Sequence, residues 1–168
     1  MYDKLTRSDV AKMEAEIEER KLVRRPELIA AVKEARAQGD LSENFEYHAA
    51  KHEKNLNESR IAYLEDMVKT AIIIDDEEVD NGKAALNRRV EVYFPEDDET
   101  ETYKIVTTIR GNSLKGLISI DSPLGKALLG HGVGETVTVT MDNGYSYEVV
   151  IKNVGAIEDD ADDAIKGF

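Results

Sequence analysis

The chain has 168 residues, enough for one ordinary domain or two small ones. It contains no cysteine, which excludes disulfides, thiol nucleophiles and cysteine-based zinc sites. Its net charge of −13 is uneven: residues 1–70 carry 13 Lys/Arg and 15 Asp/Glu, a net −2, and residues 71–168 carry 9 and 20, a net −11. Because an acidic surface repels nucleic acid, direct duplex binding by the second half is not expected. The nearly neutral first half could enter a space lined by nucleic acid; alternatively, the acidity of the chain serves only its solubility.

No apolar run reaches the roughly 18 residues that a membrane span needs. The beginning, "MYDKLTRSDVAKMEAEIEER", lacks the apolar stretch of a signal peptide. We therefore expect a cytoplasmic protein.

The first element is a long helical arm within residues 8–71, which are predicted to be helical apart from one short joint. Apolar residues recur in this arm at three-four spacing: Val10, Met13, Ile17, and then Leu28, Val32 and Ala35. Pro26 suits the first turn of a helix and disrupts an interior. It therefore predicts a break or kink near Arg25 and a new helix from Pro26. Gly39 fits the left-handed position that ends such a helix.

A second arm follows, and its apolar seam is clearer. The seam residues fall at heptad spacing, with two polar members: Tyr47, Ala50, Lys54, Asn57, Ile61, Leu64, Val68 and Ala71. The joint between the arms has about four residues, and such short joints make helices antiparallel neighbours. We predict a helical hairpin about 45 Å long, with "GDLSEN" at its tip.

Strand patterns begin after an acidic and then basic segment, "DDEEVDNGKAALNRR", which is typical of a linker. "RVEVYF" and "TYKIVTTI" flank a polar turn, "LKGLISID" is a further short strand, and "ETVTVTM" and "YSYEVVIKNV" flank "DNG", a strong hairpin pattern. "SPLGKALLG" predicts a short helix with Ser122 as N-cap, Pro123 at its first position and Gly130 as terminator. The C-terminal "EDDADDAIKGF" is expected to be flexible and solvated.

Two carboxylates in the joint, Asp40 and Glu43, have two interpretations. Three residues apart before a helix, they have the form of a capping box, in which each side chain satisfies a backbone donor. Alternatively, two carboxylates on an exposed tip form one face of a Mg²⁺ site, since this hard cation takes oxygen ligands. Two acids do not complete such a site, so a partner would have to supply the other ligands.

The tip region also carries cations and imidazoles. Arg36 and Lys51 lie on opposite arms near the joint, where they are either ordinary surface charges or phosphate contacts. His48 and His52 have the four-residue spacing of some zinc pairs, but the flanking residues do not match the metalloprotease pattern. Solvent-facing imidazoles are the simpler interpretation.

Three stretches carry a resemblance to a known family: "RRPELIAAVKEARAQGDLSENFEYHAAK", "ESRIAYLED" and "LISIDSPLGKALLGHGVGETVTV". They resemble the bacterial transcript-cleavage factors of the GreA/GreB family, and the likeness is stronger to its GreA branch. The match runs in order from about Ser8 to about Val154. Phe45, where relatives usually have Ala, and a longer acidic end depart from the family pattern.

The resemblance implies an α+β protein: an N-terminal antiparallel coiled-coil helical hairpin, followed by a small FKBP-like antiparallel sheet domain with one short helix. The expected boundaries are 1–74 for the hairpin, 75–89 for a linker, 90–157 for the polymerase-docking domain and 158–168 for an acidic tail. It also implies a monomer that enters the secondary channel of RNA polymerase and stimulates cleavage of the 3′ end of backtracked RNA, with no nuclease activity of its own.

By position in the motifs, Asp40 and Glu43 would contact a Mg²⁺ ion shared with the polymerase and would be the catalytic acids. Arg36 and Lys51 would face the RNA. Docking on the polymerase would involve the "SPLGKALLG" block, with Ser122, Pro123 and Lys126. Two alternatives are a channel-binding regulator that does not promote cleavage, and a prolyl isomerase or chaperone. The intact acid pair argues against the first, and the absence of Trp argues against the second.

Overall fold

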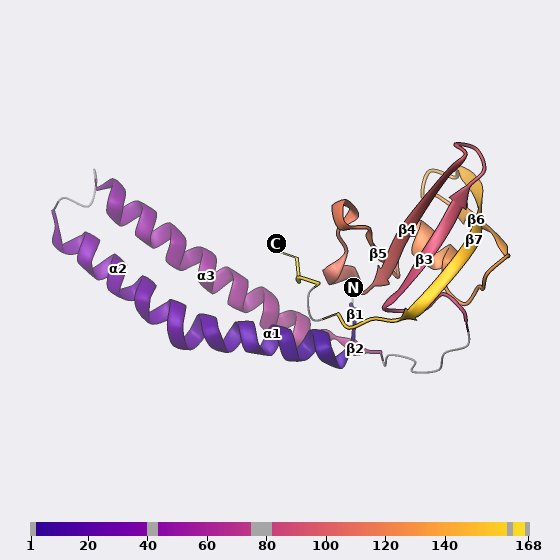
Figure 1. Cartoon of the computed structure of the whole chain (residues 1–168). Coiled ribbons are helices and arrows are strands. Elements are labelled where there is room, and N and C mark those ends of the chain that lie inside the picture. Colours follow the sequence, from indigo (N-terminus) through magenta and orange to yellow (C-terminus); the bar gives the residue numbers. More distant parts are fainter. Residues whose placement is uncertain (1–2, 40–43, 75–81, 161–162, 167–168) are drawn as a thin grey trace. The chain divides into compact units, whose positions relative to one another are not determined.

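The computed structural model describes residues 3–39, 44–74, 82–160 and 163–166 (Figure 1). The chain divides into two compact units, one built on Arg7–Ile72 and the other on Ile73–Gly167 together with Lys4–Thr6. No helix in the described part of the chain is long and apolar enough to cross a membrane.

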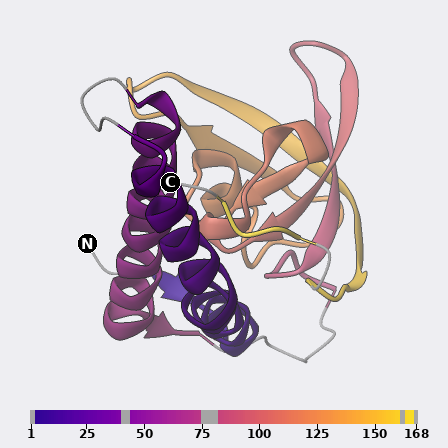
Figure 2. The same ribbon diagram turned by 90° about the vertical axis from the view of Figure 1, so that its left-hand side faces the viewer.

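The first unit is the predicted helical hairpin. Its elements are α1 (Arg7–Glu19), a π-helical segment (Arg20–Arg24), α2 (Arg25–Ala37) and α3 (Phe45–Thr70). The two arms run side by side in both views (Figures 1 and 2). The short strands β1 (Lys4–Leu5) and β2 (Ile72–Ile73) pair at the base of the arms. The predicted helical hairpin is therefore confirmed.

The first arm bends next to Pro26 (Figure 1), so the predicted break or kink near Arg25 is confirmed as a kink: helical angles continue through Arg25, and α2 begins there. Arg25 keeps helical angles (φ −57°, ψ −49°), and its N–H donates to the carbonyl of Arg20, five residues back. Proline cannot donate a helical hydrogen bond, and a π-helical turn lets the chain continue around that lost donor. Such turns are a recognised cause of helix bending.

The second unit is a curled five-stranded sheet with strand order β5-β4-β3-β7-β6. The strands are β3 (Arg88–Phe94), β4 (Glu99–Val106), β5 (Leu117–Ser119), β6 (Thr136–Thr140) and β7 (Ser146–Ile157). All pairs are antiparallel except β4 with β5, which run parallel because the chain crosses over through two short 3₁₀ turns, η2 (Thr108–Arg110) and η3 (Ser113–Lys115). The predicted "DNG" hairpin joins β6 to β7 as an antiparallel pair.

The core of this unit lies between the sheet and α4 (Pro123–Leu128), which packs against β5 and β6. Alternating residues of the strands supply it, as the period of two predicts. Its buried members are Ala84, Val90, Val92, Ile105, Ile120, Leu128, Val137, Val139, Val149 and Ile151. Ala84 belongs to the segment before β3, so the described part of that segment packs with the sheet.

The acidic C-terminal segment packs onto the sheet unit, which corrects the expectation that it is solvated. The segment contacts two cations that are almost fully buried, Lys104 and Arg110. The ammonium of Lys104 donates to the Asp159 carbonyl at 3.0 Å and pairs with the Asp163 carboxylate at 2.5 Å. Arg110 donates to the carbonyls of Asp160 and Asp163, each at 2.6 Å. The charge run that suggested solvation is therefore the partner of buried cations.

We expect a chain ending at Ile157 to unfold more easily than the full chain. Removing the segment takes away carboxylate and carbonyl partners of Lys104 and Arg110, and hydrogen bonds to charged groups each contribute about 1.5–3 kcal/mol. Hydration of the newly exposed cations offsets part of the lost hydrogen-bond stabilisation. We therefore expect the free energy of unfolding to fall by roughly 2 kcal/mol. Calorimetric melting measures it, with a chain ending at Lys166 as the matched control. Equal stability of both shortened chains would show that the segment contributes nothing.

Candidate functional site

The tip of the hairpin is bounded by the end of α2 and the start of α3. α2 ends at Ala37, and Gly39 has φ of +143°, which is positive but not the predicted left-handed helical conformation near +57°. Asp40 and Glu43 lie outside the described residues, in the joint between the two arms. The structure describes the residues on either side of this joint, at the end of α2 and the start of α3.

Asn44, and not Asp40, is the N-cap of α3. Its amide oxygen accepts the backbone N–H of Tyr47 at 3.0 Å, and its amide nitrogen donates to the carbonyl of Ala35 at 2.7 Å. One side chain therefore starts the second arm and ties it to the first. Asn44 therefore caps the described start of α3, and the interactions of Asp40 and Glu43 lie outside the described residues.

Arg36 contacts Tyr47 across the hairpin, close to the tip. Arg36 donates to the Tyr47 hydroxyl at 3.4 Å, and the guanidinium carbon of Arg36 lies 5.6 Å from the Tyr47 ring centroid. The pKa of Tyr47 lies below its ordinary value, mainly because of the hydrogen bond from Arg36, with the charge of Lys51 adding to the effect. Arg36 therefore contacts Tyr47 from the opposite arm, and Lys51 follows Tyr47 by about one turn of α3.

An exposed aromatic ring lies at the start of α3. Phe45 is the first residue of α3, and 86% of its surface is exposed. A single exposed apolar side chain is common on protein surfaces, so Phe45 alone does not mark a contact face. His48 and His52 are also exposed, and the described residues contain no group of three His, Cys, Asp or Glu side chains that could hold a metal.

A polar cluster lower in the hairpin locks the two arms in register. The Glu16 carboxylate accepts Arg60 Nε at 2.8 Å and Arg20 Nε at 2.8 Å. Arg20 also donates to the Asn57 amide oxygen at 3.0 Å, and Asn57 returns a hydrogen bond to the Arg20 carbonyl at 3.3 Å. A polar group at a seam position specifies register. This cluster fixes how far the tip projects from the base of the hairpin.

The cluster includes one residue that the heptad pattern missed. The pattern placed Asn57 in the seam, and it is 3% exposed there. Arg60 is 6% exposed and falls outside the predicted positions. Glu16 and Arg20 have the four-residue spacing of a helical ion pair. No local pattern pairs Glu16 with Arg60, because these two residues are 44 apart in the sequence.

In the sheet unit, the three residues expected to dock on a partner have different roles. Ser122 is structural, because its hydroxyl accepts the N–H of Gly125 at 3.1 Å and donates to the Ser119 carbonyl at 2.6 Å. Pro123 opens α4, as predicted. Gly125 has no room for a side chain, since a Cβ would lie 2.1 Å from the Ser119 oxygen. Lys126 is exposed and available for contact.

The sequence matches two family descriptions that together span most of the chain. Residues 4–73 match "Transcription elongation factor, N-terminal" of GreA/GreB, and residues 79–156 match "Transcription elongation factor, GreA/GreB, C-term". It is 44% identical over 150 residues to a transcription elongation factor GreA of Limosilactobacillus fermentum, covering 89% of this chain and 94% of that one. It is 44% identical over 147 residues to one of a Methylobacterium species, covering 86% and 93%.

Among solved structures, the crystal structure of GreA factor homolog 1 of Thermus thermophilus is 29% identical and covers 93% of this chain and all of that one, with a TM-score of 0.42.

We expect Glu16→Gln to weaken the hairpin at neutral pH and to make its stability less sensitive to acid. The hydrogen bond from Arg60 holds the pKa of Glu16 below its ordinary value. A lowered pKa stabilises the folded state above the unfolded value near 4.3, and this is lost as pH falls through the folded pKa. The cost at neutral pH should be about 2 kcal/mol.

Urea unfolding followed by the helical circular dichroism signal, at several pH values, measures this difference. Glu18→Gln is the control, because Glu18 is exposed on the same helix. A gap between wild type and Glu16→Gln that stayed constant down to pH values well below the folded pKa would contradict the assignment.

Proposed function

Because this chain belongs to the GreA/GreB family of transcription elongation factors, we propose that it stimulates cleavage of the 3′ end of backtracked RNA inside RNA polymerase. The chain is not itself the nuclease in this proposal: it completes the polymerase's own active site. The observation that carries the proposal is that Asn44 caps α3, which leaves Asp40 and Glu43 without that structural task at the joint of a long hairpin.

The chemistry of these side chains fits Mg²⁺. Two carboxylates offer the hard oxygen ligands that this ion takes, and Mg²⁺ commonly binds through one or two carboxylates, with water and substrate oxygens completing its shell. When bound, such an ion lowers the pKa of a coordinated water and stabilises charge developing on a phosphate. Asp40 and Glu43 would hold it jointly with carboxylates of the polymerase, so neither protein alone has the complete site.

Arg36 and Lys51 would hold the RNA in this arrangement. Arg36 contacts Tyr47, and Lys51 lies about one turn further along α3, so RNA that approached the joint would meet positive charge on both arms. Phosphate contacts of this kind position a nucleic acid without reading its sequence. Their role is to orient the bond that is cut.

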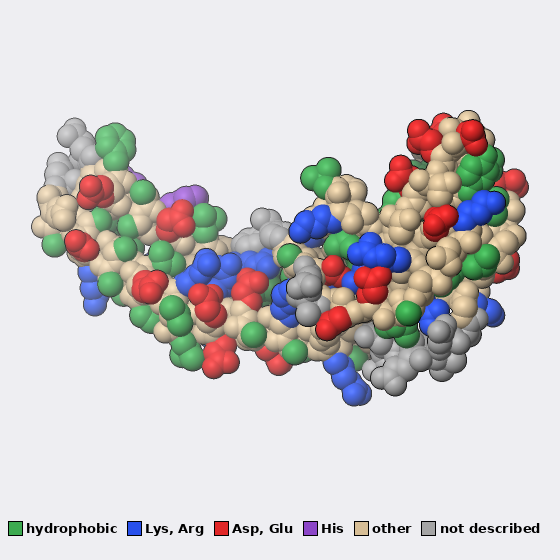
Figure 3. Space-filling model, viewed as in Figure 1, with side chains coloured by type: hydrophobic (Ala, Val, Ile, Leu, Met, Phe, Trp, Pro, Cys, Tyr) green, Lys and Arg blue, Asp and Glu red, His purple; other side chains and the backbone are tan. Residues whose placement is uncertain are grey.

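Charge distribution supports a division of labour between the units. The hairpin is nearly neutral, and Figure 3 shows acidic and basic side chains interleaved along its visible face. It can therefore enter a channel that contains RNA. The sheet unit is strongly acidic and would stay outside, where its exposed Lys126 and the surface around α4 would contact the polymerase.

We expect Asp40→Asn and Glu43→Gln each to reduce stimulated RNA cleavage by roughly tenfold or more. A neutral amide is a poorer ligand for a hard cation, and even groups behind metal ligands cost about 10–100-fold in affinity or activity. The assay is cleavage in a stalled, backtracked complex of purified polymerase, with Glu53→Gln, an exposed residue of α3, as the matched control. Binding to polymerase should be unchanged.

Two results would overturn this proposal. Full cleavage with both variants would remove the metal role of the acids. Cleavage of free RNA by the purified chain, without polymerase, would show a nuclease in its own right. A wild-type chain that bound polymerase but never raised cleavage would instead be a non-cleaving channel regulator.

A separate variant should act on binding alone. Lys126→Glu reverses an exposed charge on α4 and leaves the cap at Ser122 intact, so folding should be unaffected. We expect the protein concentration for half-maximal cleavage to rise several-fold while cleavage at saturation stays at the wild-type level. Lys115→Glu, the same charge reversal on η3, is the control. An equal half-maximal concentration for the two variants would show that Lys126 is not part of the docking surface.

A further inference from the structure

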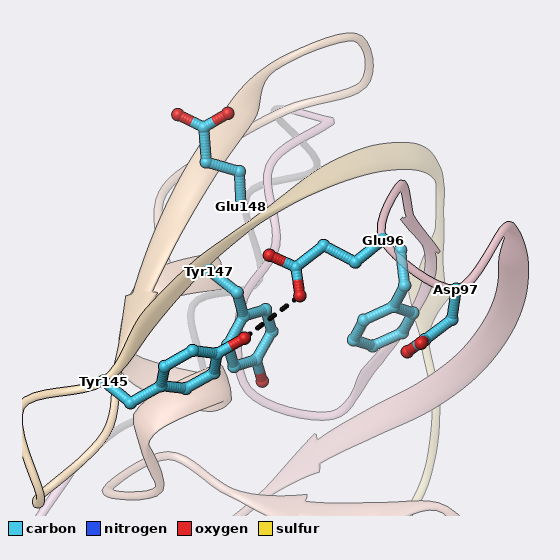
Figure 4. A pocket seen from close by; sticks show the side chains of 6 residues that line it. Glu96, Asp97, Tyr145, Tyr147 and Glu148 are labelled. Atoms are coloured by element: carbon cyan, nitrogen blue, oxygen red, sulfur yellow. Dashed lines mark hydrogen bonds between the residues drawn. The ribbon is translucent and has the colours of Figure 1, made fainter.

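A hollow in the sheet unit lies apart from every residue assigned above. It is formed where the β3–β4 turn approaches the beginning of β7, and its volume is about 250 Å³. Figure 4 shows its lining, and the residues are Phe94, Glu96, Asp97, Tyr145, Tyr147 and Glu148. Nothing in the proposed cleavage function uses this place.

Three aromatic rings form one wall of the hollow. Phe94 and Tyr147 are stacked with centroids 6.2 Å apart and planes at 30°, and Tyr145 lies 6.1 Å from Tyr147 at 31°. Tyr103 supports the row from behind by an edge contact with Phe94 at 6.4 Å. Tyr147 and Phe94 are half-buried, whereas 54% of Tyr145 is exposed. The row therefore presents fixed ring faces to an open hollow.

Carboxylates form the other side. Glu96 and Asp97 stand in the β3–β4 turn, and Figure 4 shows Glu96 above the tyrosines. Glu148 lies at the margin, with its carboxylate pointing away from the rings. None of the six lining residues is basic. Residues 95–103 contain five Asp or Glu and no Lys or Arg. Figure 3 shows acidic side chains gathered over the β3–β4 turn of the sheet unit.

One hydrogen bond joins the two sides. The Tyr145 hydroxyl donates to Glu96 Oε2 at 3.0 Å (Figure 4). This bond to a carboxylate raises the pKa of Tyr145, and burial raises the pKa of Tyr147. Both phenols are therefore neutral at physiological pH, and the negative charge of the hollow comes from carboxylates alone. Glu96 keeps a second oxygen, and Asp97 has both, for a visiting donor.

We propose that this hollow binds an arginine side chain presented by a partner protein. A cation is attracted to the face of an aromatic ring, and arginine is the commoner partner in such contacts. Its planar guanidinium stacks on rings and also donates to carboxylates in a fork, which a lysine ammonium does not do. The hollow is smaller than the roughly 300–1,000 Å³ of sites for drug-sized ligands, so a single side chain suits it better than a cofactor.

Other occupants fit the lining less well. Nucleic acid and free phosphate are repelled by the net −11 of residues 71–168. A divalent cation prefers a shell of oxygen ligands, and one wall here consists of ring faces. The proposal does not rest on the cleavage function, because it uses no residue of the hairpin or of α4.

The test is a titration of the full-length protein followed by NMR of the tyrosine ring signals. The probes are a blocked Gly-Arg-Gly peptide, the matching lysine peptide, and the matching citrulline peptide, which keeps the shape of arginine but not its charge. We expect the arginine peptide to shift the Tyr145 and Tyr147 signals in a saturable way, the lysine peptide to bind about threefold more weakly, and the citrulline peptide not to saturate.

Variants separate the two sides of the hollow. Glu96→Gln combined with Asp97→Asn should weaken arginine-peptide binding about fivefold, since exposed ion pairs are individually weak. Tyr145→Leu should weaken it by a similar factor, and Tyr145→Phe should not, because the ring face remains. Asp142→Asn is the control: this exposed residue lies in the β6–β7 turn and does not line the hollow. All of these positions are at the surface, so calorimetric melting should confirm unchanged folding.

Three outcomes would overturn the proposal. Equal binding of the citrulline peptide would show stacking without charge recognition. An effect of Asp142→Asn as large as that of the lining variants would show a diffuse acidic surface. Stronger shifts with a single-stranded oligonucleotide than with the arginine peptide would assign the rings to nucleic acid.

Discussion

A cation removed from water needs a carboxylate or carbonyl partner, and both units of this protein depend on such pairs. In the hairpin, Glu16 holds Arg60 from the opposite arm. In the sheet unit, Lys104 and Arg110 are fully buried and bind the C-terminal segment. Breaking a buried pair by removing one partner is costly, whereas forming it adds little net stability. These pairs therefore act mainly on specificity: one fixes the register of the arms, and the other fixes the path of the last residues.

The parts of the fold that follow from local patterns were predictable. Heptad spacing and a short joint gave the helical hairpin, and the "DNG" turn with alternating neighbours gave the β6–β7 pairing. Ser122 and Pro123 gave the start of α4, because an N-cap and a proline at the first position act within a few residues. At the tip, the positions of Arg36 and Lys51 near the joint followed from the same helical spacing.

The features that depend on distant residues were not predictable. Nothing local pairs Glu16 with Arg60, Lys104 with Asp163, or Tyr145 with Glu96. The acidic end was therefore mistaken for a solvated tail, and the aromatic and acidic hollow went unnoticed. Asp40 and Glu43 formed a plausible capping box in the sequence, yet the adjacent Asn44 caps α3, because it also reaches the Ala35 carbonyl on the other arm. The hydrogen bond of Asn44 to the Ala35 carbonyl is a contact between the arms that the local sequence pattern does not contain.

That choice of cap has a consequence for how an incomplete site can be kept specific. A carboxylate used as a cap is engaged with backbone donors and has less capacity to bind a metal. Asn44 supplies the cap with a neutral amide, so the negative charge of the joint remains in Asp40 and Glu43. Below the joint, the arms are joined by the polar cluster of Glu16, Arg20, Asn57 and Arg60. In the proposed function, the two joined arms would carry the acids of the joint to a site whose remaining ligands belong to another protein, and such a site demands positioning within about half an ångström.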